Sequence, residues 1–315
     1  MELKKILALK VIANYENFSK AAVHLSVSQS LLSKYITDLE TEFGVRLLYR
    51  NGRGAQLTPE GVRLLDYTQR IEDLIATAAS DLRGMKEVPS GNVSVGLSSA
   101  VGATLTIPLL TAVRRLHPAI HMQIAEGISG YVNEWLNTGR LDLAVVFDKS
   151  AGPSNHENLV REELLVVSPS GQRPGDAADC AGIALRELPF VLPGRSNKLR
   201  GVIDAYTHEL GFLLKPVAEI DSLAAMIGAV EAGLGHTILP FGAVRAALKD
   251  GRVAVTRLAA PGLRRTIYLA ASTERVPTRA VQVVADLIKR VSTELGEQGF
   301  WSPSDEMLAA PSGKR

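Results

Sequence analysis

The chain has 315 residues, 46% of them hydrophobic, so it is long enough for two or three domains with buried cores. Its 35 Lys and Arg against 33 Asp and Glu leave a formal net charge of +2, which excludes nucleic-acid binding driven by the charge of the whole protein. A single cysteine, Cys180, excludes an internal disulfide, and without a signal peptide or an apolar run of about eighteen residues we expect a cytoplasmic protein with no membrane partner.

The segment from residue 18 to residue 44 predicts two short helices joined by a tight turn. Ser19 suits the start of the first helix, because its hydroxyl can accept a backbone N–H that the helix leaves unpaired. Ser28 is expected to cap the second helix in the same way. The apolar residues of the second helix recur at steps of four, three and four and so form one face: Leu32, Ile36, Leu39 and Phe43. Gly44 is expected to end this helix, as glycine commonly does.

The opposite face of the second helix carries short or flexible hydrogen-bonding side chains, gathered toward its N-terminal half. Such side chains can reach base edges and phosphates from a helix that lies in a DNA groove. The residues expected to contact DNA from this region are Ser28, Gln29, Ser30, Ser33, Lys34 and Thr37. For this pattern taken alone, an ordinary solvated helix face is the alternative.

A basic hairpin is expected directly after the helix pair. Residues 47–49 and 56–57 predict two short strands with turn residues between them. Arg50 and Arg53 place positive charge on this hairpin, where it can contact backbone phosphates or a narrow minor groove. A helix pair followed by a basic hairpin is typical of a domain that presents one helix to DNA, so double-stranded DNA is the expected partner.

The segment from Pro59 to Lys86 predicts one long helix with Thr58 as its cap. A heptad seam with a mean period of about 3.5 follows one side of it: Leu64, Thr68, Ile71, Ile75, Ala78, Leu82 and Met85. A narrow stripe on so long a helix needs a partner, most simply the same helix of a second chain. The predicted dimer contacts are Leu64, Ile71, Ile75 and Leu82. Packing of the seam against the helix's own domain is the alternative, and residues 88–91 are expected to form a hinge.

From Asn92 onward, alternating strands and helices indicate an α/β domain with a mostly parallel sheet. Strands are expected at residues 93–97, 121–125, 141–147, 163–167, 190–192, 217–220, 236–239 and 266–271. Helices are expected at residues 105–116, 129–135, 196–210, 222–232 and 276–295. The tail from Trp301, rich in Ser, Pro and Ala, is expected to be disordered.

Three junctions between a strand and a helix carry small hydroxyl residues and form a candidate binding site. Helix N-termini offer unpaired N–H groups and a partial positive charge, which suit a small carboxylate or another anion. In such folds the junctions at the carboxyl ends of strands face a cleft. The residues expected to form this site are Ser98, Ser99, Ser129, Gly130, Phe147, Arg195, Ser196 and Ile220. Helix capping alone is the alternative for each of these serines.

No residue pattern indicates catalysis or metal binding. The six histidines lack the spacing of metal ligands, and Ser129 lacks a Gly-x-Ser-x-Gly turn. Residues 233–235 lack the rest of a dinucleotide-binding fingerprint. We therefore expect no enzymatic activity, no metal and no cofactor, apart from a small effector whose identity the sequence does not indicate.

The N-terminal segment resembles the winged helix-turn-helix of LysR-type transcriptional regulators. The matching residues follow one another without a gap in the spacing: Phe18, Ala21, Ala22, Val27, Ser28, Gln29, Leu32, Ser33, Ile36, Leu39, Glu40, Phe43, Gly44, Leu47, Leu48, Arg50, Leu57, Thr58, Pro59, Glu60 and Gly61. The sequence departs from the family at Ser30-Leu31, where a Pro-Ala pair is common, and at Tyr49, where Phe is usual. Later segments extend the resemblance to about residue 295 and look closest to the nitrogen assimilation control branch.

The resemblance implies two lobes shaped like a periplasmic binding protein, between which the chain crosses twice. The expected organisation is a DNA-binding domain at 1–58, a dimerisation helix with its hinge at 59–90, an effector-binding domain at 91–300 and a tail at 301–315. Within the effector-binding domain, lobe I is expected at about 91–161 and 267–300, and lobe II at about 162–266.

The predicted function is therefore a sequence-specific transcriptional regulator controlled by a small anionic metabolite. The resemblance implies a tetramer built as a dimer of dimers, and RNA polymerase is left open as a further partner. Two alternatives remain open at this point. One is a constitutive regulator without an effector, and the other is a solute-binding or enzymatic α/β protein with a fused helical N-terminus.

Overall fold

In a computed structural model, the chain forms two compact units, Met1–Arg83 and Gly84–Arg315. The structure describes residues 2–51, 54–83, 88–147, 155–172, 174, 179–180, 182–259 and 262–305. Each unit has a hydrophobic core of its own. None of the helices described is long and apolar enough to cross a membrane.

The N-terminal unit contains three short helices, a hairpin and one long helix. In chain order these are α1 (Leu3–Tyr15), α2 (Phe18–His24), α3 (Gln29–Phe43), β1 (Leu48–Asn51), β2 (Gly54–Leu57) and α4 (Pro59–Arg83). Its core is aliphatic and joins α1 to α3, with Leu9, Ile12, Leu32 and Ile36 all excluded from solvent. The predicted helix pair and antiparallel hairpin are therefore confirmed, as is the long helix from Pro59 to Arg83, and α1 is an element that the sequence analysis did not predict.

The helix ends follow the capping rules, with one correction to the predicted caps. Asn17, and not Ser19, caps α2, because its side chain accepts the N–H groups of Ser19 and Lys20 at 2.9 and 3.1 Å. Ser28 caps α3, and Gly44 ends it with φ of 69°, both as predicted. The predicted apolar face is wrong at its last position, since Phe43 is 42% exposed where the helix ends.

The C-terminal unit is built on one large mixed sheet with the strand order β4-β3-β5-β12-β6-β11-β7, and β10 pairs with β6. The strands are β3 (Gly91–Ser98), β4 (Ile120–Gly127), β5 (Leu143–Val146), β6 (Asn155–Pro169), β7 (Asp179–Cys180), β10 (Thr237–Pro240), β11 (Val253–Leu258) and β12 (Leu263–Ala271). Among the strands described in this sheet, only β4-β3-β5 and the short β11-β7 pair are parallel. The prediction of a mostly parallel sheet is wrong, because β12 and β6 run antiparallel to each other and to their other main partners.

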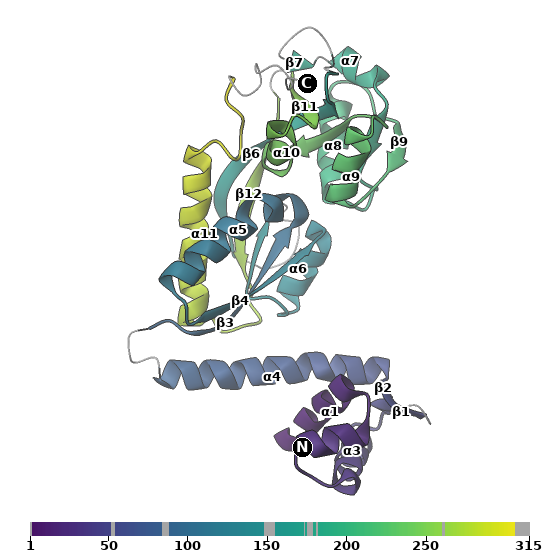
Figure 1. Ribbon diagram of the computed structural model, residues 1–315, viewed down its shortest axis with the longest axis vertical. Helices are drawn as coiled ribbons and strands as arrows, with labels where there is room; N and C mark the ends of the chain where they lie inside the picture. Colours follow the sequence, from purple (N-terminus) through teal and green to yellow (C-terminus); the bar gives the residue numbers. More distant parts are fainter. Residues whose placement is uncertain are drawn as a thin grey trace. The chain divides into compact units, whose positions relative to one another are not determined.

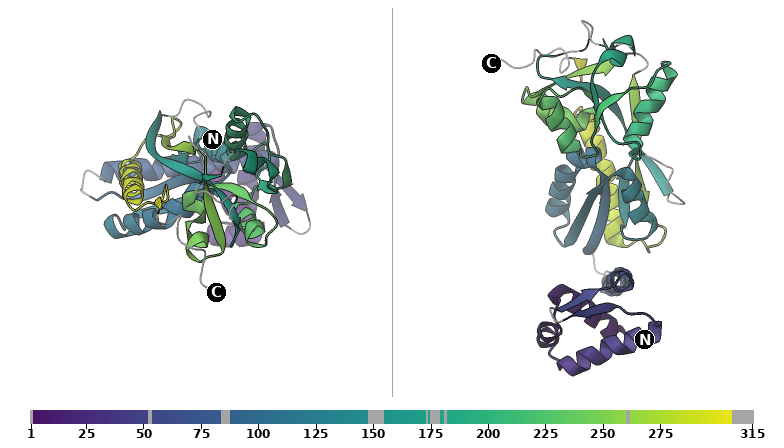
Figure 2. Two further views of the ribbon diagram at one scale, coloured as in Figure 1. Left: turned by 90° about the horizontal axis from the view of Figure 1, so that it is seen from above. Right: turned by 90° about the vertical axis from the view of Figure 1, so that its right-hand side faces the viewer.

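Helices cover this sheet in two groups, which define two lobes (Figure 1 and Figure 2). The helices are α5 (Ser99–Leu116), α6 (Ser129–Asn137), α7 (Gly182–Glu187), α8 (Lys198–Glu209), α9 (Leu223–Glu231), α10 (Phe241–Lys249) and α11 (Arg279–Glu297). Lobe I packs α5, α6 and α11 on β3, β4 and β5. Lobe II packs α8, α9 and α10 around β10, β11 and a separate parallel pair, β8 (Phe190–Leu192) and β9 (Pro216–Glu219). The long strands β6 and β12 contribute to both cores, so the chain crosses between the lobes twice, as the resemblance implied.

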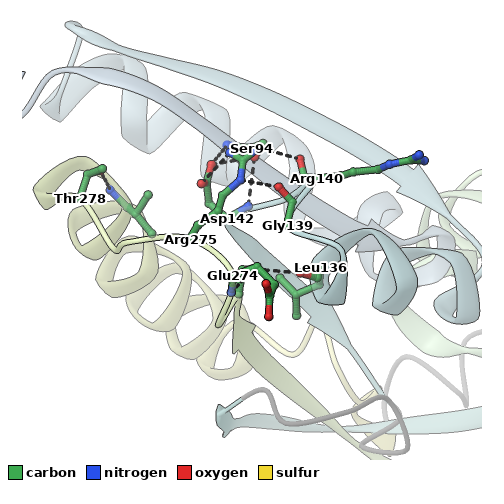
Figure 3. Close-up of polar contacts among 10 residues, drawn as sticks. Ser94, Leu136, Gly139, Arg140, Asp142, Glu274, Arg275 and Thr278 are labelled. Atoms are coloured by element: carbon green, nitrogen blue, oxygen red, sulfur yellow. Dashed lines mark hydrogen bonds and ion pairs between the residues drawn. The ribbon is translucent and has the colours of Figure 1, made fainter. Parts of the chain in front are cut away.

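A polar cluster holds the amino-terminal end of β5 in lobe I (Figure 3). The Asp142 carboxylate accepts the backbone N–H and the hydroxyl of Ser94, both at 2.7 Å. Arg275, which follows β12, donates to Asp142 at 2.9 Å and to the carbonyl oxygen of Gly139 at 2.5 Å. The cluster thus ties β3, β5 and the segment before α11 together.

The chain beyond α11 packs against both lobes. Trp301 is 3% exposed in the core of lobe I, and its Nε1 donates to the Ser292 carbonyl at 2.9 Å. The backbone N–H of Glu163 donates to the Trp301 carbonyl at 2.9 Å, and Arg257 of lobe II donates to the Pro303 carbonyl at 2.8 Å. The prediction of disorder from Trp301 is therefore wrong for residues 301–305, and residues 306–315 lie outside the described part of the chain.

Candidate functional site

The polar residues predicted to read DNA lie together at the N-terminal end and on the outer face of α3. Ser28, Gln29, Ser30, Lys34 and Thr37 are exposed, whereas Ser33 is half-buried. Two of these hydroxyl groups also serve the helix itself, because Ser28 accepts the Leu31 N–H at 3.2 Å and Thr37 donates to the Ser33 carbonyl at 3.0 Å. The amide oxygen of Gln29 accepts the Ser19 hydroxyl at 3.1 Å, so α2 positions the leading end of α3.

The hairpin is fixed to this helix by Glu40, a residue to which the sequence analysis gave no role of its own. One Glu40 carboxylate oxygen accepts the N–H groups of Leu47 and Leu48, at 2.9 and 3.3 Å. Arg50 lies on β1 opposite Ala55, and its side chain is not among the described ones. Arg53 lies outside the described residues.

The apolar seam of α4 divides into two parts with different surroundings. Leu64 packs against the core of its own unit, and Thr68 is fully buried with its hydroxyl donating to the Leu64 carbonyl. Farther along, Ile71 is half-buried and Ile75 is 48% exposed. The first part of the seam therefore packs against the helix's own domain, which was the alternative to a dimer contact, since Leu64 contacts the core of that domain. The Leu82 side chain and Met85 lie outside what the structure describes.

Within the C-terminal unit, a cavity of about 40 Å³ lies between the lobes, where the carboxyl ends of strands from both lobes meet. Four predicted site residues line it: Ser98, Ser99, Ser129 and Phe147. The other four, Gly130, Arg195, Ser196 and Ile220, are not part of its wall. Ser196 is exposed, and Ile220 packs against the lobe II core. Asn197 and Asp221 form the lobe II side instead, and Asn197 caps α8 by accepting the Leu199 N–H at 3.1 Å.

The two serine hydroxyls on the lobe I side do not cap the helices beside them. Ser98 and Ser129 are each 3% exposed, and neither hydroxyl oxygen has a hydrogen-bond partner among the described residues. Ser98 precedes α5 without capping it, and the residue at the cap position of α6 is Ile128. Because buried polar atoms are nearly always paired, two unpaired hydroxyls in one cavity wall indicate a place for a polar ligand or water.

Arg265, which also lines this cavity, belongs to a buried ion pair that the sequence analysis did not find. Arg265 on β12 is 7% exposed, and its Nε donates to a carboxylate oxygen of Glu162 on β6, which is 1% exposed. The guanidinium carbon lies 3.7 Å from the centre of the Phe147 ring. Burial raises the pKa of the Glu162 carboxyl, and the Arg265 charge offsets only part of that effect.

The described residues contain no group of three or more His, Cys, Asp or Glu side chains that could hold a metal ion. His236 is buried and its Nδ1 lies 2.8 Å from the Ser168 hydroxyl, within the lobe II core. The polar groups that meet at the cavity are thus three serine hydroxyls, an amide, one guanidinium and one carboxylate, which suit ligand binding.

Two family models match the chain. "Bacterial regulatory helix-turn-helix protein, lysR family" matches residues 3–62, and "LysR substrate binding domain" matches residues 86–293. The chain is also similar to the HTH-type transcriptional regulator BbuR of Bordetella bronchiseptica, with 28% identity over 92% of this chain and 90% of that protein. Its similarity to the nitrogen assimilation regulatory protein nac of Escherichia coli is 28% identity over 96% of this chain and 99% of that protein.

Solved structures share the same architecture. A full-length OxyR variant from Pseudomonas aeruginosa is 25% identical and superposes with a TM-score of 0.67, covering 92% of this chain and 98% of that one. CbnR, a LysR family transcriptional regulator, is 20% identical with a TM-score of 0.68, covering 93% of this chain and 99% of that one. CbnR has also been solved in complex with its target DNA.

Proposed function

Because the chain belongs to the LysR family of bacterial transcriptional regulators, we propose that a small anionic metabolite, held between its two lobes, controls how it acts on DNA. The chain is a regulator with a helix-turn-helix for DNA and an effector-binding domain, and not an enzyme. The observation that carries the proposal is the pair of buried, unpaired hydroxyls of Ser98 and Ser129. They lie at the N-termini of α5 and α6, where free N–H groups favour an anion.

On DNA, we assign base contacts in the major groove to Gln29, Ser30, Ser33 and Lys34. Arg50 and Arg53 on the hairpin hold the phosphate backbone, with Ser28 and Thr37 at the edge of the contact. The exposure of Gln29, Ser30 and Lys34 on one side of α3 supports this assignment. Ser30 stands where the family commonly has Pro, so base preference at this position is expected to be the chain's own.

Two copies are proposed to join through α4, so that two recognition helices read a two-fold site. The exposure of Ile75 in the second part of the seam supports this assembly. A tetramer, built as a dimer of dimers, and a contact with RNA polymerase in the cytoplasm belong to the same proposal. Residues 1–58, 59–90 and 91–300 would then act as DNA-binding, dimerisation and effector-binding domains.

The size of the cavity favours a second candidate, a constitutive regulator. A volume of about 40 Å³ holds only a few water molecules, because one water needs about 10–15 Å³ of such space, and it is far below the about 300–1,000 Å³ of a typical ligand pocket. A metabolite therefore has to separate the lobes to enter, and it shifts their arrangement only by its differential affinity for the two states. A protein whose lobes stay closed would bind DNA in the same way with or without metabolites.

Footprinting of the full-length chain on its own upstream DNA, with and without a panel of small organic acids, separates these candidates. Calorimetry on the same protein gives the binding directly. Ser129→Ala should abolish the heat of binding and leave stability intact, because its hydroxyl makes no hydrogen bond with any described residue. Ser196→Ala, the same change at an exposed junction, is the matched control and should bind as the wild type does. No heat with any acid and identical footprints would favour constitutive action.

A further inference from the structure

We propose that Arg265 binds the carboxylate of the effector through its two terminal nitrogens, and that the ligand is a small monocarboxylate. This inference rests on the proposed function of the cleft and assigns its main charged contact. Arg265 was absent from the residues predicted from the sequence, and nothing but its place in the structure points to it.

The first step is the state of the guanidinium. Arg265 is nine-tenths buried and lines the cavity, yet of its three nitrogens only Nε has a hydrogen-bond partner among the described residues. Nη1 and Nη2 are buried without a hydrogen-bond partner in the described part of the chain. A buried charged group with two unsatisfied nitrogens is costly, because each has lost water without replacement. Such a group is stable when a ligand or water supplies the missing acceptors.

The second step is geometry. The Phe147 ring covers one face of the guanidinium at 3.7 Å, and Glu162 takes up the Nε edge. The direction that remains is the edge carrying Nη1 and Nη2, where N–H bonds lie in the guanidinium plane. A carboxylate fits this edge with two parallel hydrogen bonds, the arrangement that arginine favours. The Ser98 and Ser129 hydroxyls, in the same wall, can donate to the remaining lone pairs of its oxygens.

The third step is charge. Arg265 already shares its positive charge with Glu162, and the Asp221 carboxylate lies in the lobe II wall of the same cavity. A ligand with two negative charges would approach these two carboxylates, and like charges in a desolvated site repel strongly. A flat, singly charged carboxylate also needs less space than a tetrahedral phosphate. The site therefore favours a monocarboxylate.

The negative charge of Glu162 is expected to lower the affinity of the site for the carboxylate ligand, because both compete for Arg265. Its second carboxylate oxygen, Oε2, is also buried without a partner among the residues described. Replacing Glu162 with Gln removes the negative charge that compensates Arg265 in the empty site. A bound carboxylate would replace that charge, so Glu162→Gln is expected to tighten binding of the carboxylate ligand. If Arg265 only paired with Glu162 and did not touch the ligand, the same change would not increase the affinity.

The test is calorimetry on the full-length chain with propionate, pyruvate, their uncharged amides and inorganic phosphate as probes. The wild type is expected to bind the acids, and to bind the amides and phosphate at least tenfold more weakly. Glu162→Gln should bind the acids several-fold more tightly. The double variant Glu162→Gln with Arg265→Gln, which leaves no buried charge unpaired, should lose binding by tenfold or more. The affinity of Arg265→Lys for the acids should lie between those of the wild type and the double variant, because lysine keeps the charge without the planar fork of two N–H groups.

Arg264→Gln is the matched control, since it removes the same charge from the exposed face of the same strand. Thermal melts and DNA binding of every variant verify folding. Acid binding that survives unchanged in the double variant would overturn the role of Arg265 and leave the effector site intact. Amides or phosphate that bind as tightly as the acids would overturn the assignment of the ligand as a monocarboxylate. If no probe binds to the wild type, the monocarboxylate site is overturned, while footprints that respond to another metabolite would still support the proposed function.

Discussion

Arg265 and Glu162 occupy directly opposing positions in the ladder between β12 and β6, and their side chains form an ion pair from which water is excluded. These are the two strands that connect the lobes. A buried pair of this kind contributes little net stability, because the loss of hydration offsets most of the attraction between the charges. Removing one partner is different, since the other charge remains buried alone.

The first prediction follows from this difference. Arg265→Met should destabilise the chain by about 3–5 kcal/mol, because Glu162 is left uncompensated, and the double variant Glu162→Leu with Arg265→Met should recover most of that loss. Urea unfolding monitored by circular dichroism measures the stability of both variants. Equal stabilities for the single and double variants would contradict a coupled pair.

A second prediction concerns DNA recognition by α3. Gln29→Ala should change the preferred base at one position by about 1–3 kcal/mol, because an amide can read a base edge with two hydrogen bonds. Arg53→Ala should weaken all sites alike and lower the salt dependence of binding by about one unit. Thr41→Ala, on the exposed face nearer the end of α3, is the control. Binding-site selection and salt titrations measure the two effects, and unchanged footprints for both variants would refute the contact assignment.

A third prediction uses the division of the α4 seam. Ile75 of the seam is 48% exposed and its neighbour Leu74, outside the seam, is 58% exposed, so changing both to Lys should leave the N-terminal unit folded and abolish dimers, which would have to bury the charge at position 75 unpaired. Leu64→Lys serves as the contrasting variant, because Leu64 packs in the unit's own core and its loss should unfold that unit. Sedimentation and circular dichroism separate the two results. An unchanged oligomer in the double variant would place the dimer contact elsewhere.

Local sequence rules predicted the parts of this fold that depend on local chemistry. The Ser28 cap, the Gly44 terminus and the Thr58-Pro59 start of α4 need only neighbouring residues, and all three are confirmed. Asn17 was missed in favour of Ser19, because both residue types cap helices and the sequence does not show which one leaves the helical backbone first.

The candidate site could be predicted only in part, for a similar reason. Junction residues follow from strand and helix ends, so Ser98, Ser99, Ser129 and Phe147 could be placed at the cavity. Arg265 could not, because it lies in the middle of a strand beside Arg264, and which of two adjacent arginines faces inward depends on the register with β6. Likewise, β6 extends well beyond its predicted core at 163–167, since its exposed part is stabilised by pairing with the distant β12.

A fourth prediction concerns the segment after α11. Trp301→Ala should destabilise the C-terminal unit by about 3–5 kcal/mol, because it removes a fully packed ring and leaves a cavity in lobe I. Truncation after Asp305 is the control and should change stability little if residues 301–305 alone make the contacts. Urea unfolding of the full chain gives both values. A Trp301→Ala variant as stable as the wild type would mean that this segment does not support the lobe.

The last prediction is a dependence of stability on pH that originates in the lobe II core. His236 is buried, its Nδ1 pairs with the Ser168 hydroxyl at 2.8 Å, and burial lowers the pKa of the imidazole below its ordinary value of 6.5. Between pH 6.5 and that lower value, the unfolded chain binds a proton that the folded chain does not. Unfolding is therefore favoured as the pH falls through this window, and the His236 contribution is fully present only above pH 6.5. His236→Gln keeps an acceptor for Ser168 without a titratable group, so it should flatten the fall in stability between pH 6.5 and 5. The same change at the exposed His208 is the matched control. Unfolding free energies measured across this range test the effect, and an identical slope in His236→Gln and the wild type would assign the acid sensitivity to another group.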